Sequence, residues 1–366
     1  MRIGILTFHC ACNYGAVLQC YALQRFLVES GHDAVVVDYR PAAVADGYRW
    51  FDIRRFWART PKRFIQKSMS EIRVIGSRKR RYEAFGDFLK TSLNLTRQVK
   101  GCEEMAALAG EFDMLVMGSD QIWNRRITGG TDRIYWGDFP RPSSTRVISY
   151  AASMEDGMDS EVVAAVRRYL PGFDAVSVRE EGLRRALSEL IPGVRVDAVA
   201  DPVLLLGKEQ WNDLASERIV NEPYLLFYQV RQSSQAYTAA RELAQRKGLR
   251  LICLSAKVEL DNSDEVTCAS PADFVSLFRY ASYVVTTSFH GTAFSLIYGK
   301  EFVCIDVSDG KGSRQKNLLD RIGSGNRIVQ DVTDVEELPA MDAETVSRRL
   351  EEYRKESVDY LKYCGI

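Results

Sequence analysis

YVVTTSFHGTAFSLIYGKEFVCI, from Tyr283 to Ile305, combines an apolar β-branched run, a polar break and a second apolar run. Tyr283 to Thr287 has the composition of a buried strand, and Phe302 to Ile305 predicts another. Between them, Thr292 to Tyr298 can form a short helix. A strand, loop, helix and strand in this order predict a β-loop-α-β unit, in which both strands run parallel in one sheet.

The polar break of this stretch contains Ser288, His290, Gly291 and Thr292. In a β-loop-α-β unit this loop opens at the carboxyl edge of the sheet, where amides at the helix N-terminus can hold a phosphate or a carboxylate. His290 is one of only three histidines, and an imidazole titrates near neutral pH. Two interpretations of His290 stay open, namely a functional group beside an anion site and a hydrogen-bonded structural residue.

Alternating strands and helices continue through most of the chain and predict two successive α/β sets. Two such sets imply two Rossmann-like lobes that face a cleft. We expect an N-terminal lobe over residues 1–200, a C-terminal lobe over 201–340 and a final helix over 341–366, with Pro202 at the crossover. The other predicted strands are Ile3 to Phe8, Ala34 to Asp38, Phe112 to Met117, Arg146 to Tyr150, Ala175 to Val178, Arg195 to Ala200, Tyr224 to Val230 and Arg250 to Leu254, and the other predicted helices are Ala16 to Glu29, Val162 to Tyr169, Gln235 to Lys247, Pro271 to Tyr280 and Ala343 to Lys362.

Composition and charge restrict the class of protein. The 366 residues are too many for one ordinary core, and lysine plus arginine equals aspartate plus glutamate at 49 each, which argues against a nucleic-acid-binding protein. Eight scattered cysteines do not resemble a secreted disulfide framework and favour reduced thiols in a cytoplasm. The N-terminus lacks the apolar region of a signal peptide, and no apolar run reaches the roughly 20 residues that span a bilayer, so we expect a cytoplasmic protein that is not integral to a membrane.

Asn13, Tyr14 and Gly15 lie in the polar loop after the first predicted strand. Asn13 could cap the next helix, and Gly15 could let a ligand approach the backbone closely. A purely structural turn is the alternative. The histidine and cysteines between His9 and Cys20 show no paired Cys-x-x-Cys spacing, so we expect no metal site.

A second polar loop follows Phe112 to Met117 and carries Ser119, Asp120, Gln121 and Trp123. A carboxylate and an amide accept and donate hydrogen bonds in fixed directions, and an indole offers an apolar face, so this set suits a sugar. The alternative is a capped turn in which Trp123 fills the core.

Arg179 follows the strand Ala175 to Val178, where its guanidinium could hold a carboxylate or a phosphate by two parallel hydrogen bonds. A surface ion pair with Glu180 or Glu181 is the alternative. Farther along, three cations follow the strand Phe302 to Ile305 and could either reach the cleft or lie in a solvated loop. They are Lys311, Arg314 and Lys316.

The segment 48–90 differs in composition from the rest of the chain. Between Arg49 and Arg81 it has twelve lysines and arginines against only Asp52 and Glu71, interleaved with aromatic residues. Such a segment can lie on an anionic membrane surface and approach lipid-linked molecules. A solvated helical excursion whose aromatic residues dock on the core is the alternative.

Four blocks, in matching order and spanning most of the chain, resemble the polysaccharide pyruvyl transferase family. They are TFHCACNYGAVLQCYALQ (7–24), GSDQIWN (118–124), VSVRE (176–180) with DPVLLL (201–206), and TSFHGTAFSLIYGKEFV (287–303). The resemblance implies a GT-B-like arrangement of the two lobes and transfer of an enolpyruvyl group from phosphoenolpyruvate to a sugar in a cell-surface glycan. It implies a pyruvate ketal as the usual product, and no cofactor besides phosphoenolpyruvate as co-substrate.

The chemistry that the resemblance implies gives each block a task. An acid must protonate the methylene carbon of phosphoenolpyruvate, and His290 is the candidate. Arg179 matches a family arginine implied in holding the anionic donor, and the amides of Gly291 and Thr292 could hold phosphate. The N-terminal lobe is assigned to the acceptor, with Asp120 as the candidate base for a sugar hydroxyl. The residues assigned to acceptor binding are Asn13, Tyr14, Gly15, Ser119, Gln121 and Trp123.

The sequence departs from the family at one position on the donor side. Many members have an arginine two residues before the histidine, where this chain has Ser288. Either Lys311, Arg314 or Lys316 replaces the missing positive charge, or the donor is bound differently.

Two other functions stay open. A GT-B glycosyltransferase that uses a nucleotide sugar has the same pair of lobes, because a fold does not specify a reaction. A non-catalytic glycan-binding protein is the second alternative, although four polar loops that converge on one cleft favour an enzyme. The expected partners are phosphoenolpyruvate, a sugar or lipid-linked oligosaccharide, and an anionic membrane touched peripherally at its inner face. No nucleic acid is expected.

Overall fold

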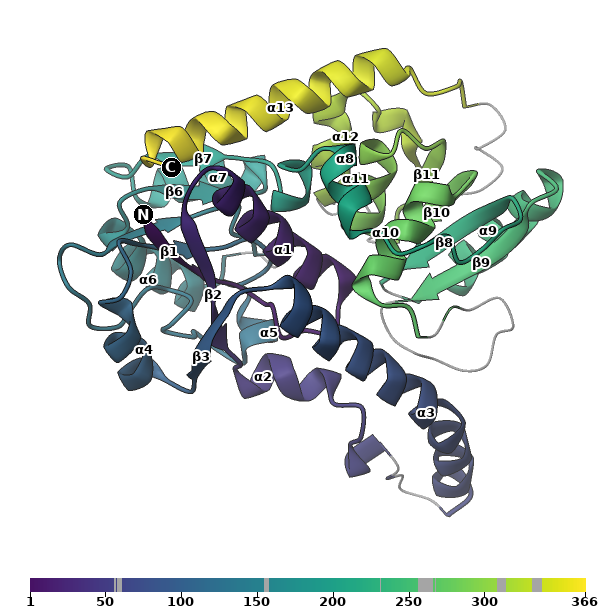
Figure 1. The fold of residues 1–366 in the computed structure, drawn as a ribbon, viewed down its shortest axis with the longest axis horizontal. Coiled ribbons are helices and arrows are strands. Elements are labelled where there is room, and N and C mark those ends of the chain that lie inside the picture. Colours follow the sequence, from purple (N-terminus) through teal and green to yellow (C-terminus); the bar gives the residue numbers. More distant parts are fainter. Residues whose placement is uncertain are drawn as a thin grey trace. The chain divides into compact units, whose positions relative to one another are not determined.

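The computed structural model describes residues 1–55, 57, 61–154, 158–230, 232–255, 266, 268–307, 314–330 and 338–366. The chain forms two compact units (Figure 1). Unit 1 contains Met1–Tyr48, Leu89–Leu206 and Glu351–Ile366, and unit 2 contains Arg49–Phe88 and Gly207–Leu350.

The basic segment groups with unit 2, whereas the sequence placed it with the N-terminal lobe. Most of it forms one long helix, α3 (Pro61–Ser92). Arg81 on α3 donates from Nη1 to the carbonyl oxygen of Ser255 at 2.7 Å, a contact between residues 174 positions apart. Local periodicity leaves no sign of such a contact, which is why the sequence assigned the segment differently. No helix in the described residues is both long enough and apolar enough to cross a bilayer.

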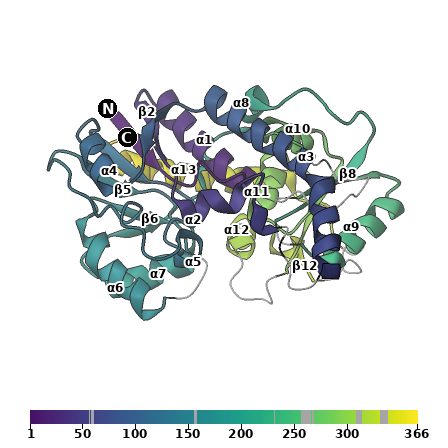
Figure 2. The same ribbon diagram turned by 90° about the horizontal axis from the view of Figure 1, so that it is seen from below.

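The C-terminal helix, α13 (Ala343–Tyr363), ends in unit 1. Its Tyr360 Oη donates to the carbonyl oxygen of Ser149 at 2.7 Å, and its Ser357 Oγ accepts from the amide of Ala200 at 2.8 Å. These contacts hold the last turns of α13 against unit 1, and the two chain ends lie near each other in both ribbon views (Figures 1 and 2).

Unit 1 is built on a parallel five-stranded sheet with the order β3-β2-β1-β4-β5. Two more parallel strands, β6 and β7, continue it, because single bridges join Ile148 to Ala175 and Ala152 to Val178. The central strands β1 and β4 are apolar and almost fully buried, as expected for a parallel sheet that helices cover on its faces. The strands are β1 Arg2–Leu6, β2 Asp33–Tyr39, β3 Leu95–Val99, β4 Met114–Met117, β5 Arg146–Ser149, β6 Val176–Val178 and β7 Val196–Ala198.

Helices connect these strands and begin at capping residues. Asn13 caps α1 (Tyr14–Glu29) by accepting from the amide of Ala16 at 3.3 Å, and Asp159 caps α6 (Ser160–Tyr169) in the same way. Helices α6 and α7 contact each other, and α7 contacts β6 (Figure 2). The other helices of unit 1 are α2 Ala42–Ala45, α4 Cys102–Ala109, α5 Arg125–Thr128 and α7 Glu181–Leu190, with the 3₁₀ helices η1 Asp46–Tyr48, η3 Leu170–Gly172 and η4 Pro202–Leu204.

Unit 2 is built on a second parallel sheet, with the order β12-β11-β10-β8-β9. Alanines of α9 pack against the apolar side chains of this sheet and form much of its core. The strands are β8 Tyr224–Gln229, β9 Arg250–Ser255, β10 Tyr283–Thr286, β11 Phe302–Ile305 and β12 Ile328–Val329, and the helices besides α3 are η2 Ile53–Arg55, α8 Lys208–Leu214, α9 Ser234–Arg246, α10 Pro271–Tyr280, α11 Phe289–Ile297, α12 Arg314–Ile322 and η5 Gly325–Arg327.

The helix after β10 begins earlier than the sequence predicts. Helix α11 starts at Phe289, so His290, Gly291 and Thr292 form its first turn instead of a loop. The physical reason is Ser288, whose extended backbone and side-chain hydroxyl cap the helix directly after the strand.

Candidate functional site

Each sheet has one point at which the chain reverses the direction in which it adds strands. This point lies between β1 and β4 in unit 1 and between β8 and β10 in unit 2. Ligands of open parallel sheets bind outside the carboxyl ends of the strands at such a switch point, because the two connections leave toward opposite faces and open a crevice. The loops after β1 and β4 carry Asn13 and Asp120, and the helix after β10 carries His290. The principal site residues predicted from the sequence therefore lie at the switch points of their own units.

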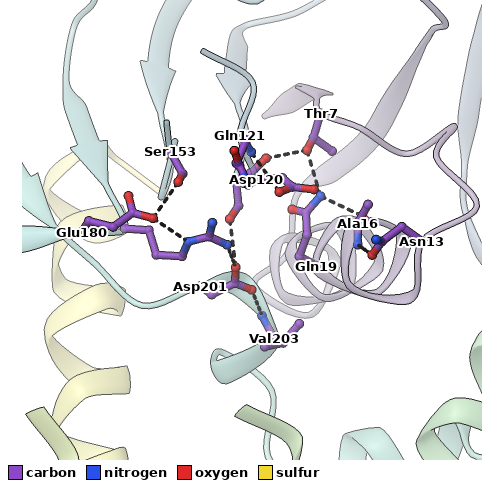
Figure 3. A network of polar contacts seen from close by, with 12 residues as sticks. Thr7, Asn13, Ala16, Gln19, Asp120, Gln121, Ser153, Glu180, Asp201 and Val203 are labelled. Carbon is purple, nitrogen blue, oxygen red and sulfur yellow. Dashed lines mark hydrogen bonds and ion pairs between the residues drawn. The ribbon is translucent and has the colours of Figure 1, made fainter. Parts of the chain in front are cut away.

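In unit 1, buried hydrogen bonds join the loop after β1 to the loop after β4 (Figure 3). Thr7 Oγ1 donates to the carbonyl oxygen of Ser119 at 2.7 Å and accepts from Nε2 of Gln19 at 2.8 Å. The amide of Gly118 donates to the carbonyl oxygen of Leu6 at 2.8 Å. The two loops therefore form one connected edge of the sheet.

Asp120 lies in this edge with an unusual backbone conformation. Its φ is 76°, and Ala151, after the neighbouring strand β5, has a φ of 51°. Residues other than glycine rarely occupy this left-handed region, and such strain concentrates at functional sites. The carbonyl oxygen of Asp120 accepts from the amide of Ser153 at 3.0 Å, and its Oδ1 accepts from the amide of Gln121 at 2.9 Å. The partly exposed carboxylate is thus held in a defined orientation.

Arg179, directly after β6, belongs to a buried polar network, of which Figure 3 labels Ser153, Glu180 and Asp201. Its Nη1 donates to Oδ2 of Asp201 at 2.6 Å, and its Nε donates to Oε1 of Glu180 at 3.3 Å. The same two oxygen atoms accept from Oγ of Ser119 at 3.2 Å and from Oγ of Ser153 at 2.6 Å. Burial opposes the charge of the guanidinium, but the carboxylates of Glu180 and Asp201 outweigh it and raise the pKa of Arg179.

These contacts give Arg179 a structural role, and its assignment to the donor stays a prediction. Its side chain is 2% exposed and that of Asp201 is 0% exposed, so the pair is buried and not the surface pair that the sequence offered as the alternative. Asp201 also accepts from Oγ of Ser119 and, through Oδ1, from the amide of Val203 at 3.1 Å. Arg179 is therefore linked through Asp201 to the loop that carries Asp120.

Two of the predicted acceptor contacts belong to the core. Trp123 is fully buried, donates from Nε1 to the carbonyl oxygen of Tyr135 at 3.1 Å and stacks on Trp136 with ring centroids 5.1 Å apart. Another indole therefore covers the ring face that was assigned to a sugar. Tyr14, the first residue of α1, is fully buried as well. Of the other predicted acceptor residues, Asn13 is partly exposed, and Gly15, Ser119 and Gln121 are buried.

Tyr48, which the sequence did not single out, lies beside Asn13. It ends η1, and its hydroxyl hydrogen-bonds the side chain of Asn13. Burial, followed by the nearby Asp120 carboxylate and the Cys12 thiol, raises the pKa of Tyr48 to about 12, so the phenol stays protonated at neutral pH. Tyr48 follows no strand or helix pattern and adjoins the basic segment, so no local signal could have found it.

His9, in the loop after β1, is held by a hydrogen bond to a carboxylate. Its Nε2 lies 2.9 Å from Oδ1 of Asp38, which also accepts from Nε of Arg40 at 2.5 Å. Burial raises the pKa of the Asp38 carboxyl, but the hydrogen bonds from His9 and Arg40 outweigh it and lower that pKa to about 2. Burial raises the pKa of the Cys10 thiol to about 12. Within the described ranges, no group of three or more His, Cys, Asp and Glu side chains could hold a metal ion.

In unit 2, Ser288 joins β10 to α11. Its Oγ accepts from the amide of Gly291 at 3.5 Å, and its carbonyl oxygen accepts from the amide of Thr292 at 3.0 Å. The sequence assigned both amides, together with Ser288, to phosphate binding. The structure corrects this assignment, because the first turn of α11 already uses them, and an anion could reach the amide of Gly291 only by displacing the Ser288 hydroxyl.

His290 occupies the second position of α11 and is 8% exposed. Its ring meets that of Phe289 edge to face, with the centroids 5.3 Å apart. The amide dipoles at a helix N-terminus favour a negative charge close by. His290 therefore lies where a proton-carrying ring and an anionic ligand can meet, with most of the ring shielded from water.

Gly291 lets α11 lie directly on the sheet. A Cβ atom at this position would lie 2.8 Å from Cβ of Thr286 and 3.0 Å from Cδ1 of Tyr228. Thr286 Oγ1 donates to the carbonyl oxygen of Tyr228 at 2.8 Å, which keeps its side chain in place. The position of His290 on the sheet thus depends on glycine at the next residue.

Gly291→Ala is expected to lower the free energy of unfolding by roughly 1–3 kcal/mol, because the added methyl group meets a strand that cannot give way. Gly86→Ala is the matched control, since Gly86 lies in α3 of the same unit and no atom lies within 4 Å of the added Cβ. There we expect a gain of about 0.5–1 kcal/mol. Urea unfolding of both variants measures the difference, and wild-type stability of Gly291→Ala would contradict the packing role.

Of the three cations predicted on the donor side, Lys311 lies outside the described residues. Lys316 is exposed on the first turn of α12, and its Nζ donates to Oδ2 of Asp320 at 2.9 Å. This pair is an ordinary surface contact of two residues four positions apart on a helix.

Gln315 ties the start of α12 to the end of β10. Its Nε2 donates to the carbonyl oxygen of Thr287 at 3.1 Å. This contact brings Arg314, the first residue of α12, close to the strand that leads into His290. No pattern in the sequence pointed to Gln315, because its partner lies 28 residues earlier.

Comparisons with known proteins bear on the family and on the fold. The family model described as Polysaccharide pyruvyl transferase matches residues 13–309. No curated protein matches the chain in sequence. Among solved structures, S. aureus MnaA in a co-structure with UDP is 10% identical, with a TM-score of 0.52 over 99% of this chain and 96% of that chain. A UDP-N-acetylglucosamine 2-epimerase is 9% identical, with a TM-score of 0.51 over the same shares of the two chains.

At this level of identity the likeness concerns the fold alone. The chain has a GT-B-type fold of two Rossmann-like units, as the sequence predicts.

Proposed function

Since the chain belongs to the polysaccharide pyruvyl transferase family and is a transferase of that kind, we propose that it transfers a pyruvyl group from phosphoenolpyruvate to a sugar of a cell-surface polysaccharide or its lipid-linked precursor. The products are a pyruvate ketal and free phosphate.

The observation that carries this proposal is the extent of the family match together with what lies inside it. The match covers residues 13–309 and so includes β4 of the first switch point and both strands, β8 and β10, of the second. At these points lie a carboxylate on a strained backbone, Asp120, and an imidazole at a helix N-terminus, His290. A carboxylate can accept a proton and an imidazole can donate one, which are the two kinds of proton transfer that ketal formation needs.

The reaction proceeds by one proton donation and two hydroxyl attacks. His290 protonates the methylene carbon of phosphoenolpyruvate, which leaves an oxocarbenium-like centre on the adjacent carbon. One sugar hydroxyl attacks that centre and gives its proton to Asp120. The bond to phosphate breaks with its electron pair, and the second hydroxyl attacks and closes the ring. The two sugar hydroxyls release two protons in all. One of them reprotonates His290, and the other leaves with phosphate.

We assign the donor to unit 2 and the acceptor to unit 1. The N-terminus of α11 favours an anion, and Arg314 at the start of α12 adds the positive charge that Ser288 lacks. Asn13 and Tyr48 support the acceptor side, because an amide and a protonated phenol both hydrogen-bond sugar hydroxyls.

We also place the enzyme peripherally at the inner face of the membrane, with a lipid-linked oligosaccharide as acceptor. The support is the basic segment with its aromatic residues, which suits an anionic membrane surface.

Incubation with phosphoenolpyruvate and extracted lipid-linked oligosaccharide tests the proposed reaction. We expect one phosphate released for each pyruvyl group added, with the mass of the product measured by mass spectrometry. Release of a nucleotide from a sugar nucleotide, without phosphate from phosphoenolpyruvate, would identify a glycosyltransferase instead. Glycan binding without product from either donor would identify a non-catalytic binding protein.

A further inference from the structure

Exposed large apolar side chains are concentrated in one segment of unit 2. Among the described residues, seven of the thirteen large apolar side chains that are exposed lie within residues 51–72. Single exposed apolar residues are common, whereas a cluster of this kind marks a binding surface. We call this cluster the apolar face, and it consists of Phe51, Ile53, Trp57, Phe64, Ile65, Met69 and Ile72.

Helix α3 has an apolar stripe on the side that does not pack on the protein. Ile65, Met69 and Ile72 follow one another at helical spacing and share one side of the helix. A helix turns by about 100° per residue, which places Val74 and Phe85 on the opposite side. Those two side chains are buried. The stripe is therefore not the side by which α3 packs on its own unit.

The aromatic residues of the segment differ in burial. Phe85 and Phe88 are buried. They follow the stretch from Arg49 to Arg81, for whose aromatic residues docking on the core was the alternative to a membrane surface. Trp57 and Phe64 are 68% and 45% exposed, so that alternative does not account for them. These two exposed aromatic side chains are therefore accessible to a binding partner.

The surface around the apolar face is positively charged. Between Arg49 and Arg81 only two residues are acidic, and both are paired within the segment. Asp52 accepts from Nε of Arg54 at 2.9 Å, and Glu71 accepts from Nη1 of Arg78 at 2.6 Å. The other basic side chains therefore give the surface a strong net positive charge. Two copies of such a surface repel each other, whereas an anionic surface attracts it.

We propose that this surface docks on a bilayer that contains anionic phospholipid. The apolar face enters the boundary between headgroups and acyl chains, and exposed Arg73 and Lys79, which flank the stripe on α3, meet the lipid phosphates. Trp57 suits this boundary, because an indole has an apolar body and a polar N–H. The inference deepens the membrane location in the proposed function and rests on it, but docking itself needs neither phosphoenolpyruvate nor acceptor.

Co-sedimentation with vesicles tests the docking. We expect the full-length protein to bind vesicles of phosphatidylcholine mixed with phosphatidylglycerol, to bind pure phosphatidylcholine vesicles much less, and to lose binding as salt is raised. Arg73→Gln with Lys79→Gln is expected to weaken binding to the anionic vesicles by about fivefold per charge removed. Equal binding to neutral and anionic vesicles, or no binding to either, would overturn the proposal.

Substitution of the stripe residues distinguishes specific docking from non-specific adsorption to vesicles. Ile65→Ser, Met69→Ser and Ile72→Ser together are expected to weaken binding at least about tenfold. Ile219→Ser with Val230→Ser is the matched control, because these two exposed apolar residues of unit 2 lie outside the apolar face. The control is expected to bind like the wild type.

Three further measurements keep the outcome clear. Circular dichroism melting confirms that the triple serine variant is folded, and wild-type vesicle binding by that folded variant would overturn the proposal. Sedimentation without vesicles shows whether the stripe instead joins two copies, which a change from dimer to monomer in the variant would establish. Phosphate release with a soluble acceptor is expected to be unchanged in the variant, so a failure of docking and a failure of the proposed reaction are distinguishable.

Discussion

Replacing His290 by glutamine is expected to reduce pyruvyl transfer by about 100- to 10,000-fold while the protein keeps its fold. The reason is that glutamine keeps polar atoms in the first turn of α11 but cannot donate a proton to the methylene carbon of phosphoenolpyruvate. Phosphate release and product mass, measured together under saturating donor, give the loss in kcat.

A second histidine provides the control for this prediction. His32 lies in the turn between α1 and β2, at the amino edge of the sheet of unit 1, and His32→Gln is expected to leave the rate unchanged. Thermal melting of both variants checks that each is folded. A folded His290→Gln variant with a near-normal rate would remove His290 as the acid and leave the family assignment in place.

Replacing Arg179 by methionine is expected to lower the free energy of unfolding by about 3–5 kcal/mol, because it leaves two buried carboxylates without their counter-charge. Asp201 is 0% exposed and lies 2.6 Å from Nη1 of Arg179, so water cannot take over the contact. Combining Arg179→Met with Asp201→Leu is expected to restore part of the loss. The recovery is partial, because Asp201 also caps η4 through the amide of Val203.

Arg184→Met is the matched control for the buried pair. Arg184 pairs with Glu181 on α7, where the two side chains are 34% and 40% exposed, and the expected loss is about 0–1 kcal/mol. Urea unfolding of the variants gives the ranking. A stable Arg179→Met variant whose KM for phosphoenolpyruvate rises sharply would show that Arg179 touches the donor and is not a positioning residue.

The parallel sheets were predictable because their strands are buried on both faces and read as short apolar runs. Strand β11 and helix α10 have the bounds that composition predicts, Phe302–Ile305 and Pro271–Tyr280. Helix α10 also begins with a capping box at Ser270 followed by proline, a start signal that lies wholly within neighbouring residues.

Elements without such a local signal were missed. Strand β3, with the sequence LTRQV, is an edge strand and mostly not buried, so it has no apolar run. Helix α3 is rich in charge along its length, and its grouping with unit 2 depends on contacts such as that of Arg81 with Ser255. Long-range contacts of this kind follow from folding and not from periodicity.

The candidate site was predictable in position and much less in role. Polar residues after apolar strands pointed to the carboxyl edges, where Asp120 and His290 do lie. The same signal could not distinguish Trp123, which is buried in the core, from Asp120, which is partly exposed. The sequence did not point to Tyr48 or Gln315, because the partner of each is distant in the sequence and becomes a neighbour only in the folded chain.

Neighbouring residues were sufficient to establish two parallel-sheet units and to bring Asp120, Arg179 and His290 to strand ends, because burial of strands and starts of helices are local properties of the chain. Whether a polar group at a strand end meets a ligand or another part of the protein depends on residues far away in the sequence. Arg179 donates to the carboxylate of Asp201, and the amide of Ser153 donates to the carbonyl oxygen of Asp120. Those partners come together only after the chain has folded, and that is why the structure was needed to find what Arg179 and Asp120 contact.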